Sequence, residues 1–282
     1  MIISIASGKG GTGKTTVATN LAVSLSDKNV KLLDCDVEEP NAHLFINPLI
    51  DKKETITTPV PEIDESKCNL CRKCIDICQF KAIAIIGDTI LPFTDLCHSC
   101  GGCMEVCPEG AISWTGRELG IIERGHKNNI EFIHGRLRVG EAMSPPLIKK
   151  VRQYAGGNGL TIIDAPPGTS CPVIAAMKNT DFIILVTEPT PFGLHDLKLA
   201  AGAVRLLNIP CGIIINRSDM GDNGVKEFSK EYNIPILMEI PFDRRIAESY
   251  SRGELVVDNI PEWKEKYINL YEKIEKIVQE NY

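Results

Sequence analysis

The fold of this 282-residue chain is decided by the stretch Ser7-Gly8-Lys9-Gly10-Gly11-Thr12-Gly13-Lys14-Thr15-Thr16. It stands between a short apolar run, residues 1–6, and an apolar segment, residues 17–25. The pattern G-x4-G-K-T between a strand and a helix is typical of a P-loop. Its backbone N–H groups and the helix N-terminus form a concave, positive site for phosphate groups. We therefore expect an α/β domain with a parallel sheet, in which Lys14 contacts the phosphates and Thr15 ligates Mg²⁺.

Further apolar runs follow in the order expected of such a domain. Residues 30–36 read as a strand that ends at Asp36, and residues 161–164 as a strand that ends at Asp164. Ligands of a parallel sheet bind at the carboxyl ends of its strands, so both acids should lie at the phosphate site. There they would hold Mg²⁺ or orient the attacking water. The runs 181–187, 211–215 and 236–240 complete a predicted sheet that is covered on both faces.

The lysine at position 9 gives this loop a further feature. The run from Lys9 to Thr16 resembles the deviant Walker A motif of the MinD/ParA class of P-loop ATPases, to which the nitrogenase iron protein also belongs. The resemblance covers the whole chain, because residues 36–41 resemble the switch I segment of that class and residues 165–168 its switch II. It implies that Lys9 reaches the ATP of a second subunit in a nucleotide-dependent dimer. The alternative is a solvated loop lysine.

The same resemblance implies a set of site residues. Those expected to bind ATP and its phosphates are Gly8, Lys9, Gly10, Gly11, Thr12, Gly13, Lys14, Thr15, Thr16, Gly168, Asn216, Arg217 and Pro241, with adenine near Asn216 and the backbone of Pro241. Those expected to act in hydrolysis are Lys9, Lys14, Asp36 and Asp164. The expected Mg²⁺ ligands are Thr15, Asp36 and Asp164.

Eight cysteines repeat one spacing, C-x2-C-x2-C-x3-C, at an offset of 29 residues (97 minus 68). They are Cys68, Cys71, Cys74 and Cys78, then Cys97, Cys100, Cys103 and Cys107. A duplicated run of this kind is the pattern of two iron–sulfur sites in one small module. Two zinc sites would suit pairs of CxxC better than triplets. Disulfides are disfavoured because the first residues read as a strand and a glycine loop, not as a secretion signal.

Residues 62–115 resemble a bacterial two-cluster ferredoxin. The resemblance implies that the fourth cysteine of each run serves the other cluster. One [4Fe–4S] cluster would then be held by Cys68, Cys71, Cys74 and Cys107, and the other by Cys78, Cys97, Cys100 and Cys103. We therefore expect a discontinuous P-loop ATPase domain, residues 1–60 and 116–282, and an inserted α+β ferredoxin-like domain, residues 61–115.

Three cysteines lie outside the repeat. Cys35 and Cys211 sit in or beside predicted strands and read as small buried hydrophobic residues. Cys171 follows Asp164 by seven residues, a place comparable to that of the bridging-cluster cysteine in the nitrogenase iron protein. We find no second ligand outside the eight cysteines, so a structural role for Cys171 is favoured and a bridging role stays open.

Composition narrows the classes of function. The net charge of −6 and the lack of a basic cluster interleaved with aromatic residues argue against nucleic-acid binding. No apolar stretch approaches the roughly 20 residues that span a bilayer. Residues 263–278 read as an amphipathic helix whose polar face balances Lys and Glu, which favours docking on the core over a membrane surface. Eleven cysteines without a secretion signal suggest a reducing, cytoplasmic compartment.

The position of the cysteine module suggests the mechanism. It enters the chain between Asp36 and Asp164, in the two segments expected to respond to the γ-phosphate. This order predicts an ATPase that gates electron transfer through two [4Fe–4S] clusters, acting as a homodimer, or a heterodimer with a paralogue, on an unidentified redox partner. Two other classes stay open: a scaffold or carrier for iron–sulfur or metal cofactors, and a positioning ATPase with redox-sensing clusters.

Overall fold

The computed structural model describes residues 1–280. Its contacts divide the chain into two compact units. Unit 1 comprises Met1–Glu54, Ile122–Arg136 and the described residues from Ser144 onward, and unit 2 comprises Thr55–Ile121 and Leu137–Met143. Unit 2 is thus longer than the predicted insertion, residues 61–115, and includes a segment that returns from unit 1. The chain passes between the two units four times.

A nine-stranded sheet organises the described residues, in the order β11-β10-β9-β1-β8-β2-β7-β6-β3. Its strands are β1 (Ile2–Ala6), β2 (Val30–Asp34), β3 (Leu49–Ile63), β6 (Ile112–Lys127), β7 (Ile130–Leu137), β8 (Leu160–Asp164), β9 (Phe182–Thr187), β10 (Cys211–Asn216) and β11 (Ile236–Ile240). Every neighbouring pair from β11 to β7 is parallel. The predicted parallel sheet is therefore confirmed.

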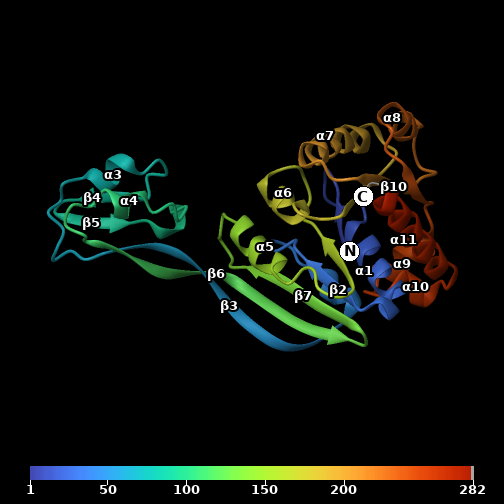
Figure 1. Ribbon diagram of the computed structural model, residues 1–282, viewed down its shortest axis with the longest axis horizontal. Coiled ribbons are helices and arrows are strands. Elements are labelled where there is room, and N and C mark those ends of the chain that lie inside the picture. Colours follow the sequence, from blue (N-terminus) through green and yellow to red (C-terminus); the bar gives the residue numbers. More distant parts are fainter. Residues whose placement is uncertain (281–282) are drawn as a thin grey trace. The chain divides into compact units, whose positions relative to one another are not determined.

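Helices cover both faces of this sheet in unit 1 (Figure 1). One group consists of α1 (Lys14–Ser24), α2 (Ala42–Ile46), α10 (Val256–Asn259) and α11 (Glu262–Glu280), in which α1 contacts each of the others. The other group consists of α5 (Pro145–Arg152), α6 (Cys171–Met177) and α7 (Pro191–Leu207). The helices α8 (Gly224–Tyr232) and α9 (Arg244–Ser251) follow β10 and β11. Because both faces are covered, central strands such as β8 and β9 are buried along their whole length.

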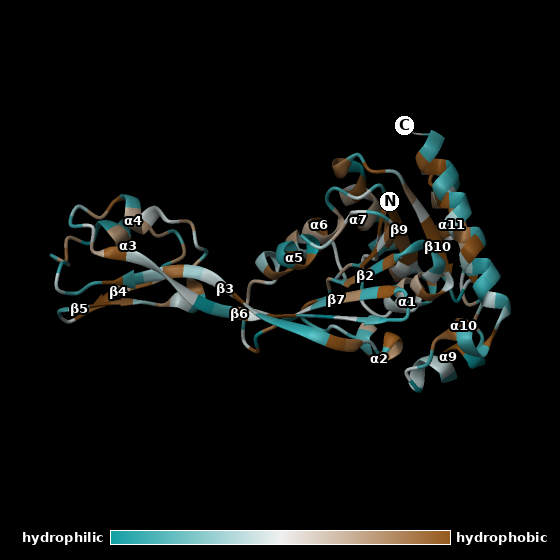
Figure 2. Ribbon diagram, turned by 60° about the horizontal axis from the view of Figure 1, so that its bottom comes forward, coloured by the Kyte–Doolittle hydropathy of each residue, from teal (hydrophilic) through white to brown (hydrophobic). Residues whose placement is uncertain are grey.

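The last described helix docks on the core. Helix α11 buries Trp263, Tyr267, Leu270, Tyr271 and Ile274, and it packs against α1. Figure 2 shows hydrophobic and hydrophilic residues alternating along it, as expected of a helix with one buried face. The predicted core docking of this amphipathic segment is confirmed. None of the helices described is both long enough and apolar enough to cross a membrane.

Unit 2 contains the repeated cysteine segments. It has an antiparallel hairpin, β4 (Ile83–Ile86) and β5 (Thr89–Pro92), and two short helices in contact, α3 (Lys73–Ile77) and α4 (Gly102–Glu105). These helices begin 29 residues apart, at the offset of the cysteine repeat (102 minus 73). The left-handed backbone positions repeat at the same offset: Leu70 and Ser99, Arg72 and Gly101, Lys81 and Gly110. The two segments therefore share one backbone conformation.

Candidate nucleotide site and cysteine cavities

The P-loop joins β1 to α1 in unit 1. Gly11 and Gly13 have φ values of 77° and 99°, which suit glycine and let the loop turn tightly. A Cβ atom at Gly13 would lie 2.7 Å from Asn216 Nδ2, so this glycine also allows a close approach to β10. The Asn216 side chain donates to the carbonyl of Thr12 (2.8 Å). Asn216 thus fastens the loop to the end of the neighbouring strand.

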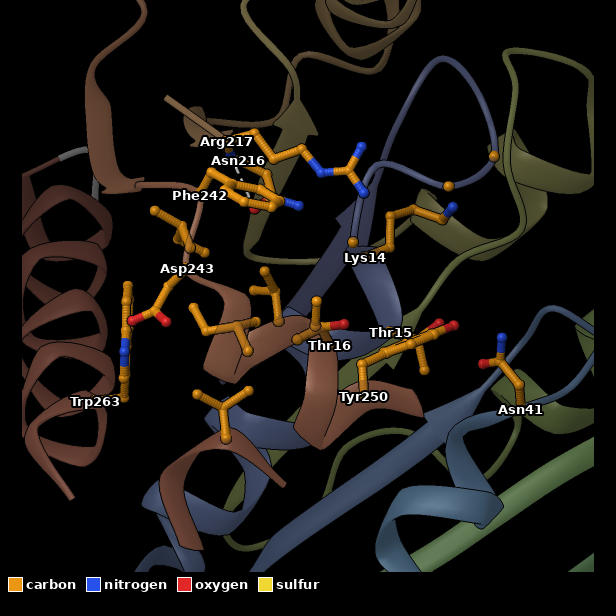
Figure 3. Close-up of a pocket in the computed structure, with 18 of the residues that line it drawn as sticks. Lys14, Thr15, Thr16, Asn41, Asn216, Arg217, Phe242, Asp243, Tyr250 and Trp263 are labelled. Carbon is orange, nitrogen blue, oxygen red and sulfur yellow. Dashed lines mark hydrogen bonds between the residues drawn. The ribbon is translucent and has the colours of Figure 1, made fainter. Parts of the chain in front are cut away.

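A cavity of about 380 Å³ opens at this loop (Figure 3). Among the residues of the predicted nucleotide site, those that line it are Gly10, Gly11, Gly13, Lys14, Thr15, Thr16, Asp36, Asn216, Arg217 and Pro241. Lys14 is only 6% exposed and lies over the loop. Those that are not part of the lining are Gly8, Lys9, Thr12, Asp164 and Gly168. The structure thus brings ten of the predicted residues around one cavity.

Acidic residues gather at the carboxyl ends of β2 and β8. Asp34 and Asp164 are register partners in these neighbouring strands, and both are buried. Burial, together with the adjacent carboxylate, raises the pKa of Asp34 well above its ordinary value. Burial raises the pKa of Asp164 to about 7 and that of Asp36 to about 6, against the opposing charge of Lys14. This corner of the unit therefore favours a bound cation.

The environment of Asp164 fits Mg²⁺. Both of its carboxylate oxygens are buried and have no hydrogen-bond partner in the described part of the chain. A buried carboxylate without a partner is costly, and a hard cation or the water molecules on it supply what is missing. Thr15, at the start of α1, offers the hydroxyl expected of a P-loop. These residues suit a nucleotide with its metal ion.

Asp34 has a different role, which the sequence analysis missed. Its carboxylate accepts from the backbone N–H groups of Asp36 (3.1 Å), Asn41 (3.1 Å) and Ala42 (3.0 Å). It thereby holds the loop that contains Asp36 and the first turn of α2. Both acids stand at the end of one apolar run, so the sequence alone did not tell which carboxylate faces the cavity and which binds the backbone.

Lys9 is held within its own chain. Its Nζ lies 3.5 Å from a carboxylate oxygen of Glu188, whose other oxygen accepts from Arg217 (2.8 Å). Glu188 is 9% exposed and follows β9, where only the motif order could have indicated it. Gly168, with φ of 101°, donates its N–H to the carbonyl of Ser7 (3.0 Å). Segments from four strand ends therefore meet around the P-loop.

The eight repeated cysteines line two cavities in unit 2. The first is lined by Cys68, Cys71, Cys74 and Cys107. The second is lined by Cys78, Cys97, Cys100 and Cys103. Each cavity thus takes three cysteines from one run and the fourth from the other. Four thiols per cavity suit the chemistry of a [4Fe–4S] cluster, which needs one thiolate per iron. Among the described residues, no group of His, Cys, Asp and Glu is arranged to hold a single metal ion.

Backbone amides point at the sulfur atoms of the crossing cysteines. The N–H of Ala82 donates to Cys78 Sγ and that of Ala111 to Cys107 Sγ, both at 3.3 Å. These donors are 29 residues apart, as the repeat requires. Such N–H···S bonds stabilise thiolate charge around a cluster. The three remaining cysteines are placed differently: Cys35 is buried, Cys211 is half-buried and Cys171 is exposed at the start of α6.

The fold and the loop define a class, the P-loop nucleotide-binding proteins with a mostly parallel sheet. Within that class, the model of the CobQ/CobB/MinD/ParA nucleotide binding domain matches residues 3–256, and the chain belongs to this family. The structure of the septum site-determining protein MinD from Pyrococcus horikoshii, complexed with Mg-ADP, is similar with a TM-score of 0.62. The two are 23% identical, and the match covers 98% of this chain and 96% of that one, which shows the fold.

Curated relatives extend the comparison. The uncharacterized protein MJ0579 of Methanocaldococcus jannaschii is 32% identical, and the match covers 98% of this chain and 96% of that protein. An iron-sulfur cluster carrier protein of Aquifex aeolicus is 28% identical over 93% of this chain. The match covers 63% of that relative, so the chain spans less than two thirds of its length.

Proposed function

We propose that this chain binds and hydrolyses ATP, carries two [4Fe–4S] clusters in unit 2, and couples its nucleotide state to electron transfer. The observation that carries the proposal is the division of eight cysteines into two sets of four, in a chain whose other unit has a P-loop. The family supports nucleotide binding. The crossed sets and the repeated backbone support two lasting cluster sites, as in a ferredoxin.

The residues of unit 1 have distinct tasks in this proposal. The ammonium group of Lys14 and the N–H groups of the loop stabilise charge on the transferred phosphoryl group, while Thr15 and Asp164 hold Mg²⁺ directly or through water. Asp36 lines the cavity and has a pKa of about 6, so it is mostly ionised at neutral pH and can orient the attacking water. Lys9 leaves Glu188 for the nucleotide of a second subunit.

The chain offers a covalent route from nucleotide to unit 2. The carboxylate of Asp34 binds both the loop of Asp36 and the first turn of α2. Helix α2 ends at Ile46, and β3, which begins at Leu49, carries the chain into unit 2 at Thr55. A rearrangement of the loop on ATP binding is therefore transmitted along the backbone. The clusters supply one-electron transfer, and the nucleotide state sets when it takes place.

The test measures the cluster potentials under anaerobic conditions with ATP, with ADP and without nucleotide, after an iron count near eight per chain. We expect the potentials, or the rate at which a small-molecule acceptor is reduced, to change with the nucleotide. Equal values in all three states would refute the coupling. Lys14→Ala is the matched variant, because it should abolish hydrolysis and the nucleotide effect while it retains all iron.

A second function has a specific observation in its favour. The relative from Aquifex aeolicus is named an iron-sulfur cluster carrier protein. A carrier would hold labile clusters and pass them to an apo-protein, whereas an electron carrier retains them. Incubation of the loaded protein with an apo-ferredoxin and a chelator separates the two, because transfer of iron that depends on ATP would favour the carrier.

A further inference from the structure

The nucleotide cavity extends beyond the P-loop. At the far side from Lys14 it is walled by side chains of α9, α10 and α11, namely Ile246, Ala247, Tyr250, Val256, Trp263 and Tyr267. This end is largely apolar, whereas the end at the loop presents Lys14 and backbone N–H groups. A nucleotide has the same polarity, with a charged triphosphate and a flat base. The geometry thus directs the base toward α9 and α11.

Trp263 is an unusual part of that wall. It is 2% exposed, and its indole Nε1–H is buried without an acceptor in the part of the chain that the structure describes. A buried donor that lacks a partner costs about 1–3 kcal/mol. The ring itself is well supported, because Lys266 Nζ lies 3.9 Å from its centroid and the Tyr267 ring packs at 6.4 Å. The unmet donor therefore sits on a fixed ring in the cavity wall.

The other polar group at this end is already engaged. The Asn216 amide donates to the carbonyl of Thr12 and accepts from the N–H of Arg217 (3.0 Å). Its bonds tie the P-loop to β10, which limits its capacity to read a base. Trp263 has no such commitment (Figure 3). We propose that Trp263 is a specificity-determining residue of this site, whose indole N–H donates to an acceptor nitrogen of the purine base of a bound nucleoside triphosphate.

This inference rests on the proposed nucleotide site and deepens it. Trp263→Phe keeps an aromatic ring and removes the donor. We expect it to raise the dissociation constant of ATP about threefold to tenfold, the value of one neutral hydrogen bond. Binding of inorganic tripolyphosphate, which has no base, should stay unchanged. Ile274→Val, a buried change on the same helix outside the cavity lining, is the matched control and should affect neither ligand.

Base analogues locate the acceptor. ATP analogues that lack N1, N3 or N7 are compared on the parent and on Trp263→Phe, and one of them should bind the two proteins equally. A fluorescence experiment leaves Trp263 in place. In Trp114→Phe it is the sole tryptophan, and ATP should change its emission while tripolyphosphate does not.

Two results would overturn the inference while the nucleotide site stands. One is an ATP affinity of Trp263→Phe within twofold of the parent, and the other is an equal loss of ATP and tripolyphosphate binding. If the parent binds neither ligand, the proposed function fails as well.

Discussion

The buried carboxylate of Asp164 should make the nucleotide-free protein less stable as the pH rises. Its pKa of about 7, in place of the ordinary 3.8, is caused mainly by burial. Between about pH 4 and pH 7 the folded protein holds a proton on Asp164 that the unfolded chain has released. The free energy of unfolding therefore falls as the pH rises through this window and levels off above it. A difference of roughly 3 pH units corresponds to at most about 4 kcal/mol.

Asp164→Asn removes the charge and keeps the shape. At pH 8 and without nucleotide, we expect this variant to be about 2–4 kcal/mol more stable than the parent, because the parent bears a buried carboxylate without a partner. At pH 4 the two should be nearly equal. The remaining slope comes from Asp34, whose pKa is raised in the same direction. The measurement is urea unfolding between pH 4 and pH 8.5, with the exposed change Asp27→Asn as control.

Addition of nucleotide and Mg²⁺ should reverse the order. A ligand at a hundredfold excess over its dissociation constant stabilises the parent by about 2.7 kcal/mol. Asp164→Asn should lose most of this gain together with ATP hydrolysis. Parallel pH curves for the parent and the variant, or a variant that is less stable at pH 8, would refute the assignment of Asp164 as an unmet metal-site carboxylate.

Other predictions concern single contacts. Glu188→Gln frees Lys9 from an ion pair worth at most about 1 kcal/mol, so sedimentation at a fixed ATP concentration should show up to about fivefold more dimer; an unchanged profile would mean that the contact does not compete with dimer formation. Asn216→Ala removes the bond to the Thr12 carbonyl and should weaken tripolyphosphate binding about threefold to tenfold by calorimetry, whereas equal affinity would show that the loop holds itself. Cys171→Ser should retain eight irons per chain by a colorimetric assay, and a loss of iron would assign it to a bridging cluster.

Much of unit 1 could be predicted because its strands are short, wholly apolar and followed by chemically distinctive residues. The strand β8 is buried at every position and ends at Asp164, so burial and motif order agree. The strands β3, β6 and β7 were not predicted. The first seven residues of β3 are exposed, and β3 occupies an edge of the sheet, so this segment lacks the apolar run that marked the other strands.

The cysteine sets were predictable for a different reason. A repeat at a constant offset requires two copies of one backbone, and the thiols then have few arrangements available. Long-range polar contacts could not be predicted in this way. Glu188 meets Lys9 across 179 positions (188 minus 9), and Trp263 enters the nucleotide cavity from the last described helix. Such contacts depend on how strands are ordered in the sheet, which no local pattern encodes.

The four passages of the chain between its units bear on the proposed coupling. After β7 the chain re-enters unit 2, where Arg138 donates its N–H to the Leu119 carbonyl (2.9 Å) and Arg117 forms an ion pair with the buried Glu141. The strand β7 itself is the parallel neighbour of β2, which ends at Asp34. A ferredoxin-like insertion joined by one flexible linker at each end would not need this return. The second pair of passages ties unit 2 to the strand beside the nucleotide-sensing loop. Pro substitution at Arg136, at this crossing, should therefore weaken any nucleotide effect on the cluster potentials without loss of iron or of ATP hydrolysis, and an undiminished effect would place the coupling on the α2–β3 route alone.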